Sequence, residues 1–327
     1  MYGTIAETHI LITGGAGFIG SNLTDFLLGL GGKVTVLDNF STGRRENLRA
    51  AAAHPGFRLI EGDIRDPETC AAAAAGTDLA VHLAALGSVP RSIQDPCVSV
   101  AVNVSGFVNV LFAAVRAGVK RVVYASSSSV YGDDPRLPKV ESRTGRPLSP
   151  YALTKTADEW FAENFRAVYG LDSIGLRFFN VFGRRQDPDG AYAAVIPRFA
   201  AALLRHTPPV INGDGSYSRD FTYVDNVLHA VALALCVTDP VAVNQVYNVA
   251  CGARVTLNEL CAVLRDELGR FDAAITGIEP VHGAVRAGDI PHSLADIGKA
   301  RRLLGYEPRF DVRRGLALAA RWYAENL

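Results

Sequence analysis

Short apolar runs alternate with helical stretches through the first half of the chain, and this alternation constrains the fold more than any other feature. The runs are rich in Val and Ile, which is typical of strands buried on both faces of a parallel sheet. They cover residues 9–12, 33–37, 58–60, 79–83, 121–125 and 174–179. Strand, helix and strand in repetition predict an α/β fold with a doubly wound parallel sheet of the Rossmann type.

Two of the intervening stretches have clear helix boundaries. Apolar residues at helical spacing between positions 19 and 30 end at Gly31-Gly32, and glycine commonly terminates helices. A longer stretch, 98–117, lies between Pro96 and Gly118. We therefore expect a helix over each of them.

The pattern changes after about residue 180. Pro and Gly cluster there, the apolar runs become short, and two late helical stretches cover 257–268 and 313–325. These features predict a Rossmann domain over residues 1–179 and a smaller α/β substrate domain over 180–327. We expect the chain to interleave between the two.

The charge balance and the cysteines exclude several classes of protein. The 327 residues include 33 Lys+Arg and 33 Asp+Glu, so the net charge is zero, which argues against a nucleic-acid-binding protein. The five scattered cysteines form no Cys-x-x-Cys pair and the histidines show no metal-ligand spacing, so we expect no disulfide framework and no metal. The N-terminus lacks a signal-peptide pattern and no apolar run reaches the length of a membrane span. We therefore expect a soluble, cytoplasmic protein.

A glycine-rich turn follows the first predicted strand. Gly14, Gly17 and Gly20 fit a tight turn, a close approach to a pyrophosphate and close packing of a helix on the sheet. Asp38 ends the second strand, where a carboxylate accepts both ribose hydroxyls of an adenosine and repels a 2′-phosphate. This arrangement predicts bound NAD, although Arg44 and Arg45 lie close by and leave NADP as an alternative.

A tyrosine and a lysine stand four residues apart on one predicted helix. Tyr151 and Lys155 therefore share a face, and an ammonium near a phenol favours the phenolate, which can take a proton from a sugar hydroxyl. The serine stretch 126–129 follows the fifth strand, at the sheet edge where ligands of doubly wound folds bind. These groups predict a hydride-transfer site that uses a tyrosine base.

The motifs together resemble the extended short-chain dehydrogenase/reductases. The match rests on the glycine turn 14–20, Asp38-Asn39, the serine stretch ending at 130–132, and the pair Tyr151 and Lys155. Further segments, 84–92, 177–183, 193–197 and 218–225, resemble UDP-hexose 4-epimerases, most closely the bacterial group acting on UDP-N-acetylglucosamine and its uronic acid. The resemblance spans nearly the whole chain, from Gly14 to Ser293.

The resemblance implies a role for each site residue. Tyr151 would be the catalytic base, Lys155 would hold the nicotinamide ribose, and Ser127 would bind the reacting hydroxyl. The implied NAD-binding residues are Gly14, Gly17, Phe18, Ile19, Gly20, Asp38, Asn39, Asp63, Ile64, Ala84, Ala85, Tyr151 and Lys155. The implied UDP-sugar-binding residues are Ser88, Ser128, Ser129, Asn180, Ala194, Val195, Arg219, Arg286, Asp289 and Ser293.

Two departures favour one branch of the family. Dehydratases and uronate decarboxylases place Asp or Glu at the positions of Ser128 and Ser129, so dehydration is disfavoured here. Epimerases confined to unacetylated sugars carry a bulky aromatic residue at the position of Ser293, whereas a serine leaves room for an N-acetyl group. The resemblance thus implies interconversion of UDP-GlcNAc and UDP-GalNAc, with some activity on UDP-Glc and UDP-Gal.

Two alternatives remain at this point. One is 4-epimerisation of UDP-N-acetylglucosaminuronate, with Arg91, Arg184 or Arg185 receiving the carboxylate. The other is a catalytically silent NAD-binding scaffold, against which the intact Tyr151, Lys155 and Ser127 argue. The resemblance also implies a homodimer formed by the helices near 98–117 and 151–169.

Overall fold

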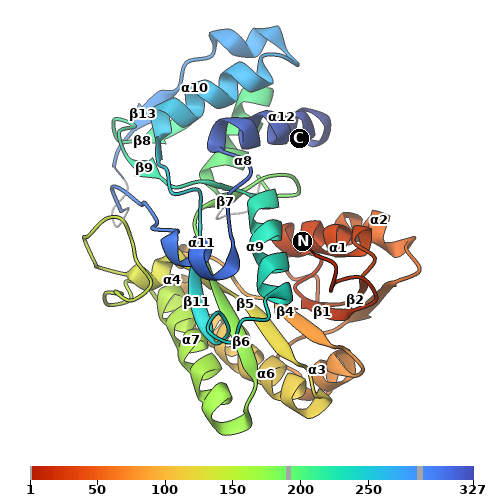
Figure 1. Cartoon of the computed structure of the whole chain (residues 1–327). Coiled ribbons are helices and arrows are strands. Elements are labelled where there is room, and N and C mark those ends of the chain that lie inside the picture. The colour runs from red at the N-terminus through yellow and green to blue at the C-terminus, as the bar shows by residue number, and fades with distance from the viewer. Residues whose placement is uncertain (1, 189–192, 286–289) are drawn as a thin grey trace.

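A parallel sheet of seven strands lies at the centre of the computed structural model, which describes residues 2–188, 193–285 and 290–327 (Figure 1). The strands follow the order β11-β6-β5-β4-β1-β2-β3, and every neighbouring pair is parallel. They are β1 (His9–Thr13), β2 (Lys33–Asp38), β3 (Phe57–Glu61), β4 (Leu79–His82), β5 (Arg121–Ser127), β6 (Asp172–Phe178) and β11 (Gln245–Val249). The predicted doubly wound Rossmann sheet is confirmed, and all six predicted strands are present.

Alternating side chains of the strands pack against two helical layers. Ile10 and Ile12 of β1 are buried on the face covered by α1 (Phe18–Gly29) and α9 (Val224–Cys236). Leu11, between them in sequence, is buried on the opposite face. The helices of that face are α3 (Pro67–Ala74), α6 (Gly106–Ala117) and α7 (Pro150–Tyr169), and Figure 1 shows the two layers on either side of the sheet.

The expected long helix over 98–117 is present but irregular. It consists of α5 (Pro96–Val100), a π-helical segment (Ala101–Ser105) and α6, and it ends at Gly118 in the left-handed conformation. Within the described residues this 22-residue helix is also the one long and apolar enough to cross a membrane. Phe107 and Leu111 of α6 are nevertheless fully buried in the protein core, whereas Phe112 is exposed.

Residues after 180 complete the sheet and also form a separate group of helices beyond its two helical layers. The strand β11 pairs with β6, and α9 packs in the same core cluster as Ile10 and Ile12 of β1. The upper part of Figure 1 contains α8 (Val195–Leu204), α10 (Leu257–Leu268) and α12 (Val312–Asn326), which pack on one another. The predicted helix 257–268 has the bounds of α10, whose Thr256 and Glu259 form a capping box.

Short elements connect these layers. Three two-stranded ladders pair β7 (Val181–Phe182) with β10 (Thr222–Tyr223), β9 (Ser218–Arg219) with β12 (Val255–Thr256), and β8 (Val210–Asn212) with β13 (Val281–Gly283). The remaining α-helices are α2 (Arg49–Ala52), α4 (Val89–Gln94) and α11 (Gly298–Leu304). The β9 ladder is the one that carries a predicted substrate-binding residue, Arg219.

His82 at the end of β4 is a packed core histidine. It is 1% exposed, its Nδ1 lies 2.8 Å from Thr13 Oγ1, and its ring packs against Phe107. Burial, with a smaller contribution from the positive charge of Lys155, lowers the pKa of His82 to about 3. The ring is therefore neutral in the folded protein at pH values where it is protonated in the unfolded chain.

We predict that His82→Asn flattens the acid side of the pH–stability profile. Because the pKa of the folded state is depressed, the unfolded state binds more protons below about pH 6.5, and stability falls as the pH falls. The contribution of His82 is about 2 kcal/mol between pH 7.5 and pH 5. Chemical denaturation at both pH values measures it, with the exposed His54→Asn as the matched control. An equal loss of stability in wild type and His82→Asn would contradict the prediction.

Candidate active site

The glycine turn between β1 and α1 brings backbone segments into close contact. Gly14 has a φ of +72°, and a Cβ there would lie 2.6 Å from the backbone nitrogen of Ala84. A Cβ on Gly20 would lie 2.1 Å from the carbonyl oxygen of Gly14. At Gly17 the nearest atom to a Cβ is that same oxygen, at 3.3 Å, so a methyl group nearly fits there. Gly14 and Gly20 are therefore required by packing, whereas Gly17 leaves its backbone open to a ligand.

A cavity of about 330 Å³ opens at the carboxyl ends of β1 to β4. This is the point where the strand order reverses, and ligands of doubly wound sheets bind there. Most of the residues predicted to bind the cofactor line it, namely Gly14, Gly17, Phe18, Ile19, Gly20, Asp38, Asn39, Asp63, Ile64, Ala84 and Ala85. The structure thus brings together residues from four strand ends that are far apart in sequence.

Asp38 is held rigidly at the rim of this cavity. Its Oδ2 accepts a hydrogen bond from the backbone N–H of Ala16 at 2.8 Å, and its Oδ1 accepts one from the N–H of Phe40 at 2.8 Å. The residue is only 8% exposed. Each oxygen keeps a free lone pair, so the carboxylate can still accept bonds from two vicinal hydroxyls.

The two arginines that left NADP as an alternative are engaged with carboxylates. Arg44 forms an ion pair with Asp187 at 2.9 Å, and Arg45 forms one with Glu61 at 2.5 Å. The Arg45 guanidinium also lies over the ring of Phe40. A 2′-phosphate would have to compete with these partners and with the nearby Asp38.

Asp63 has less capacity for a ligand than its position suggests. The Arg65 guanidinium binds both of its oxygens, at 3.0 and 2.7 Å, and Asn39 Nδ2 donates to Oδ2 at 2.7 Å. Hydrogen bonding to Arg65 lowers the pKa of Asp63 to about 2. With the Arg65 backbone N–H also bound to Oδ1, the lone pairs are used, and a bond to an adenine amino group would have to displace one of these donors.

Tyr151 and Lys155 lie in the first turns of α7, which starts after the N-cap Ser149. The Lys155 ammonium is buried and donates to the carbonyl oxygen of Ala125 at 3.0 Å and to Asp158 Oδ2 at 3.0 Å. Ala125 also lines the cavity at the strand ends, so Lys155 lies directly behind one of its wall residues. Tyr151 and Lys155, both predicted to bind the cofactor, are not themselves among the residues that line this cavity. Asp158 was not singled out in the sequence, although it continues the helical stripe at seven residues from Tyr151.

Two further residues that the sequence reasoning missed fix the start of α7. Ser92 Oγ accepts a hydrogen bond from the backbone N–H of Tyr151 at 3.0 Å. Asn103, from the π-helical segment, donates to Thr154 Oγ1 at 3.2 Å and accepts from the N–H of Leu86 at 2.8 Å. No local spacing marks these residues, since their partners lie 59, 51 and 17 residues away.

The serine stretch continues directly from β5. Ser127 Oγ accepts the N–H of Ser129 at 3.2 Å and caps a short 3₁₀ turn, Ser128–Tyr131. Ser129 Oγ is buried and has no hydrogen-bond partner among the described residues. Ser126 donates to Glu159 of α7 at 2.5 Å, which ties the stretch to the helix that carries Tyr151.

Residues predicted to bind the substrate converge on the segment 218–220. Asn180 Nδ2 donates to the carbonyl oxygen of Asp220 at 3.0 Å, and the N–H of Ser293 donates to the carbonyl oxygen of Ser218 at 3.0 Å. Arg219 Nη1 lies 3.0 Å from the carbonyl oxygen of Pro291. The structure therefore places Asn180 and Ser293 next to the segment that carries Arg219.

The other predicted substrate residues are more scattered. Ser88 caps α4 and lines a hollow of about 480 Å³ that adjoins the strand-end cavity. Ala194 is the exposed N-cap of α8, and Val195, its first residue, is half-buried. Arg286 and Asp289 lie outside the described residues.

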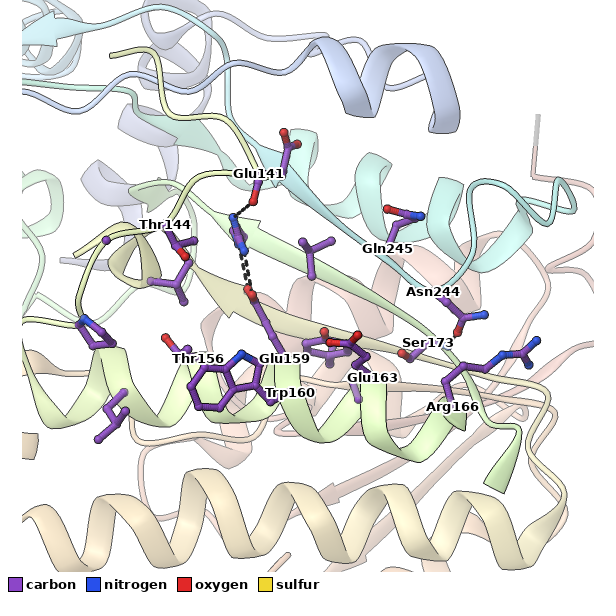
Figure 2. Close-up of a pocket in the computed structure, with 18 of the residues that line it drawn as sticks. Glu141, Thr144, Thr156, Glu159, Trp160, Glu163, Arg166, Ser173, Asn244 and Gln245 are labelled. Carbon is purple, nitrogen blue, oxygen red and sulfur yellow. Dashed lines mark hydrogen bonds and ion pairs between the residues drawn. The ribbon is translucent and has the colours of Figure 1, made fainter. Parts of the chain in front are cut away.

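Another cavity, larger than the one at the strand ends, lies on a different face of α7. It is a groove of about 630 Å³, and Figure 2 shows Thr156, Glu159, Trp160 and Glu163 along its helical wall. Arg177 also lines the groove and binds both oxygens of Glu159, at 2.9 and 2.8 Å. Neither Tyr151 nor Lys155 lines this groove. We therefore do not assign the reaction to this groove, although it is larger than the strand-end cavity.

Residues 2–188, 193–285 and 290–327 contain no cluster of three His, Cys, Asp or Glu side chains that could hold an ion. The thiol of Cys251 is also poorly suited as a nucleophile, because burial raises its pKa to about 12. The reactive groups at the sheet edge are thus hydroxyls, an amine and carboxylates.

Comparison with known proteins agrees with this geometry. The model of the NAD dependent epimerase/dehydratase family matches residues 10–250. A UDP-glucose 4-epimerase of Mycolicibacterium smegmatis is 39% identical over 315 residues, which cover 96% of this chain and 97% of the relative.

Two solved structures are similar over almost the whole chain. A UDP-N-acetylglucosamine 4-epimerase from Methanobrevibacter ruminantium, in complex with UDP-N-acetylmuramic acid, has a TM-score of 0.91 at 37% identity and covers 98% of this chain and 100% of its own. A UDP-glucose 4-epimerase from Thermus thermophilus, in complex with NAD, has a TM-score of 0.85 at 32% identity and covers 98% and 100%. The resemblance inferred from the motifs is confirmed: the chain belongs to the NAD dependent epimerase/dehydratase family.

Proposed function

We propose that the protein is a UDP-sugar 4-epimerase that interconverts UDP-GlcNAc and UDP-GalNAc through a transient 4-keto sugar. The observation that carries this proposal is the position of α7. Lys155 touches Ala125 at the wall of the strand-end cavity, so the helix that bears Tyr151 is docked against the site of the dinucleotide. The similarity to epimerases of UDP-glucose and UDP-N-acetylglucosamine supports the same reaction.

The strand-end cavity fits NAD. The backbone at Gly17 and the positive end of α1 suit the pyrophosphate, and Asp38 suits the adenosine ribose. NAD, when bound, supplies a reversible hydride acceptor. Lys155 has one N–H left after its bonds to Ala125 and Asp158, and that N–H would hold the nicotinamide ribose.

Tyr151 and the serine stretch would handle the proton. Tyr151 would take the proton of the sugar 4-hydroxyl as that carbon loses a hydride. After the 4-keto sugar has turned, the hydride would return to the opposite face of the carbon and Tyr151 would return the proton to the 4-oxygen. Ser127 would bind the reacting oxygen, and Ser129 Oγ is a buried hydroxyl still without a partner among the described residues. Returning the same proton and hydride leaves the enzyme unchanged after each turnover.

Binding through the nucleotide allows the sugar to turn. Arg219 is held against the carbonyl oxygen of Pro291 and would bind the diphosphate. We propose Arg286 as a further arginine of the diphosphate and ribose pocket and Asp289 as a contact of the ribose. Binding energy placed on UDP stays constant while the sugar reorients, so both epimers reach the same tyrosine.

The acetylated sugar is favoured by Ser293. Its backbone is fixed to Ser218, so the small side chain sits on a fixed strand-like segment beside Arg219. Two of the three arginines named for the uronate alternative are engaged, because Arg184 is paired with Asp225 at 2.8 Å and Arg185 with Asp25 at 2.6 Å. That alternative therefore depends on Arg91, which lines the same hollow as Ser88.

We also propose a homodimer built on α5, α6 and α7. These adjacent helices expose large apolar side chains that a monomer would leave in water. They are Val98, Val100, Phe112, Leu153, Trp160, Val168 and Tyr169, each at least 40% exposed.

Replacing Gly17 by Ala should remove NAD without unfolding the protein. A methyl group there meets little protein but occupies the space of the pyrophosphate. Gly20→Ala should instead lower the Tm, because its Cβ would overlap the backbone of Gly14. The matched control is Gly29→Ala, with no heavy atom within 4 Å of its Cβ. NAD released by acid from each purified variant is the measurement, and full NAD content in Gly17→Ala would contradict the assignment.

Anomeric-proton NMR with separate UDP-GlcNAc, UDP-Glc and UDP-GlcNAcA tests the reaction and the sugar. We expect UDP-GlcNAc to be converted fastest, and Tyr151→Phe to lose about 10²- to 10⁴-fold in kcat while keeping NAD. Ser293→Tyr should slow the acetylated substrate selectively. Turnover of the uronate alone would make the sugar assignment wrong, and no turnover of any substrate by NAD-loaded wild type would favour the silent scaffold.

Phe112→Glu should dissociate the dimer, because it places a charge in the centre of the proposed apolar contact. Sedimentation velocity should give twice the 34.9-kDa chain mass for wild type and the single mass for the variant. Leu318→Glu, exposed on α12, is the matched control. A monomeric wild type would contradict the proposal.

A further inference from the structure

We propose that Asp158 is a positioning residue that keeps the Lys155 ammonium charged and directed along the face of α7 that carries Tyr151. The inference rests on the proposed function, because it assigns Tyr151 the role of base. Neither the sequence motifs nor the family match assigns a role to Asp158.

The three side chains form one stripe on the helix. Tyr151, Lys155 and Asp158 are separated by four and three residues, so they lie one above another on the same face. Lys155 is 2% exposed and Asp158 is 0% exposed, and Nζ lies 3.0 Å from Oδ2. This is an ion pair enclosed by protein on the inner side of α7.

A buried ammonium needs such a carboxylate to stay protonated. The other contact of Lys155, the carbonyl oxygen of Ala125, is a dipole and offsets little of the cost of removing the charge from water. Burial by itself lowers the pKa of Lys155, but the charges of Asp158 and Tyr151 outweigh it and raise the pKa above its usual value.

The neighbouring charged groups cannot replace Asp158. Glu159, next along α7, is bound by Arg177 of β6 and by Ser126 of β5. His82 of β4 is neutral, because burial and Lys155 lower its pKa to about 3. Tyr124 of β5 is neutral as well, since burial holds its pKa far above the usual value. Asp158 is thus the carboxylate that faces the ammonium directly.

The pair also leaves the lysine able to act on a ligand. An ammonium has three N–H groups, and two are used by Asp158 and Ala125. Asp158 Oδ1 has no hydrogen-bond partner among the described residues, so the carboxylate is held through Oδ2 alone. The third N–H is therefore the one available to the ribose or to the Tyr151 oxygen.

Lysine-specific ¹³C labelling tests the ionic role without depending on any substrate. The chain has only five lysines, so the ¹³Cε signal of Lys155 in the NAD-loaded enzyme can be assigned by its absence from Lys155→Met. In wild type we expect Lys155 to titrate above the ordinary lysine pKa of about 10.4. In Asp158→Asn, whose amide can still accept the hydrogen bond, it should titrate below that value.

The pH dependence of kcat should follow the titration of Lys155. The alkaline limb of kcat should move to lower pH in Asp158→Asn, with a loss on the order of tenfold at pH 9.5 relative to pH 7.5. Glu163→Gln is the matched control, since it makes the same change on an exposed position of α7 and should leave both curves in place.

The outcomes separate this proposal from the proposed function. A Lys155 signal that titrates below the ordinary value in wild type, or that does not move in Asp158→Asn, overturns the role of Asp158. The wild-type titration decides even if the variant does not fold. If Lys155 shifts as expected but no UDP-sugar is turned over, the ion pair stands and the proposed function fails.

Discussion

The close contact of Gly14 with Ala84 sets the geometry on which the whole site depends. Because a Cβ at Gly14 would lie 2.6 Å from the next backbone, the chain can cross the end of β4 only without a side chain at this point. A Cβ at Gly20 would likewise overlap the carbonyl oxygen of Gly14, so the absence of a side chain there lets α1 begin close to the sheet. The cavity at the strand ends, the position of Asp38 at its rim and the direction of the α1 dipole all follow from this arrangement.

The part of the site around Arg219, which we propose binds the substrate, depends on the buried carboxylate of Asp220. Asp220 is fully buried and accepts backbone N–H groups of Cys251, Gly252 and Ala295 at 2.9, 3.0 and 3.3 Å. Asp220 thereby joins the residues after β11 to the segment around Ala295, and Arg219 is its neighbour in sequence. Charged groups that would bind a diphosphate are thus positioned by backbone hydrogen bonds and not by the core alone.

Local patterns predicted the first half of the chain well and the long-range connections poorly. The buried strands, the glycine turn and the Tyr151–Lys155 pair depend on residues near one another in sequence, and the structure places them as expected. The strand β11 was missed because Asn248 and Gln245 interrupt its apolar character. The helix α9 was missed because it is buried on nearly every side, so polar residues do not mark a clear outer face. Ser92 and Asn103 were missed because only the fold brings them to α7.

The late arrival of α9 and β11 has a consequence for how the chain is made. Until about residue 250 has left the ribosome, β6 is an unpaired edge strand, and the face bearing Ile10 and Ile12 lacks one of its two helices. The nascent Rossmann half therefore carries exposed apolar surface through much of its synthesis, and it becomes a closed unit only when the later segment returns. Independent folding of a fragment that stops at residue 179 is disfavoured for the same reason.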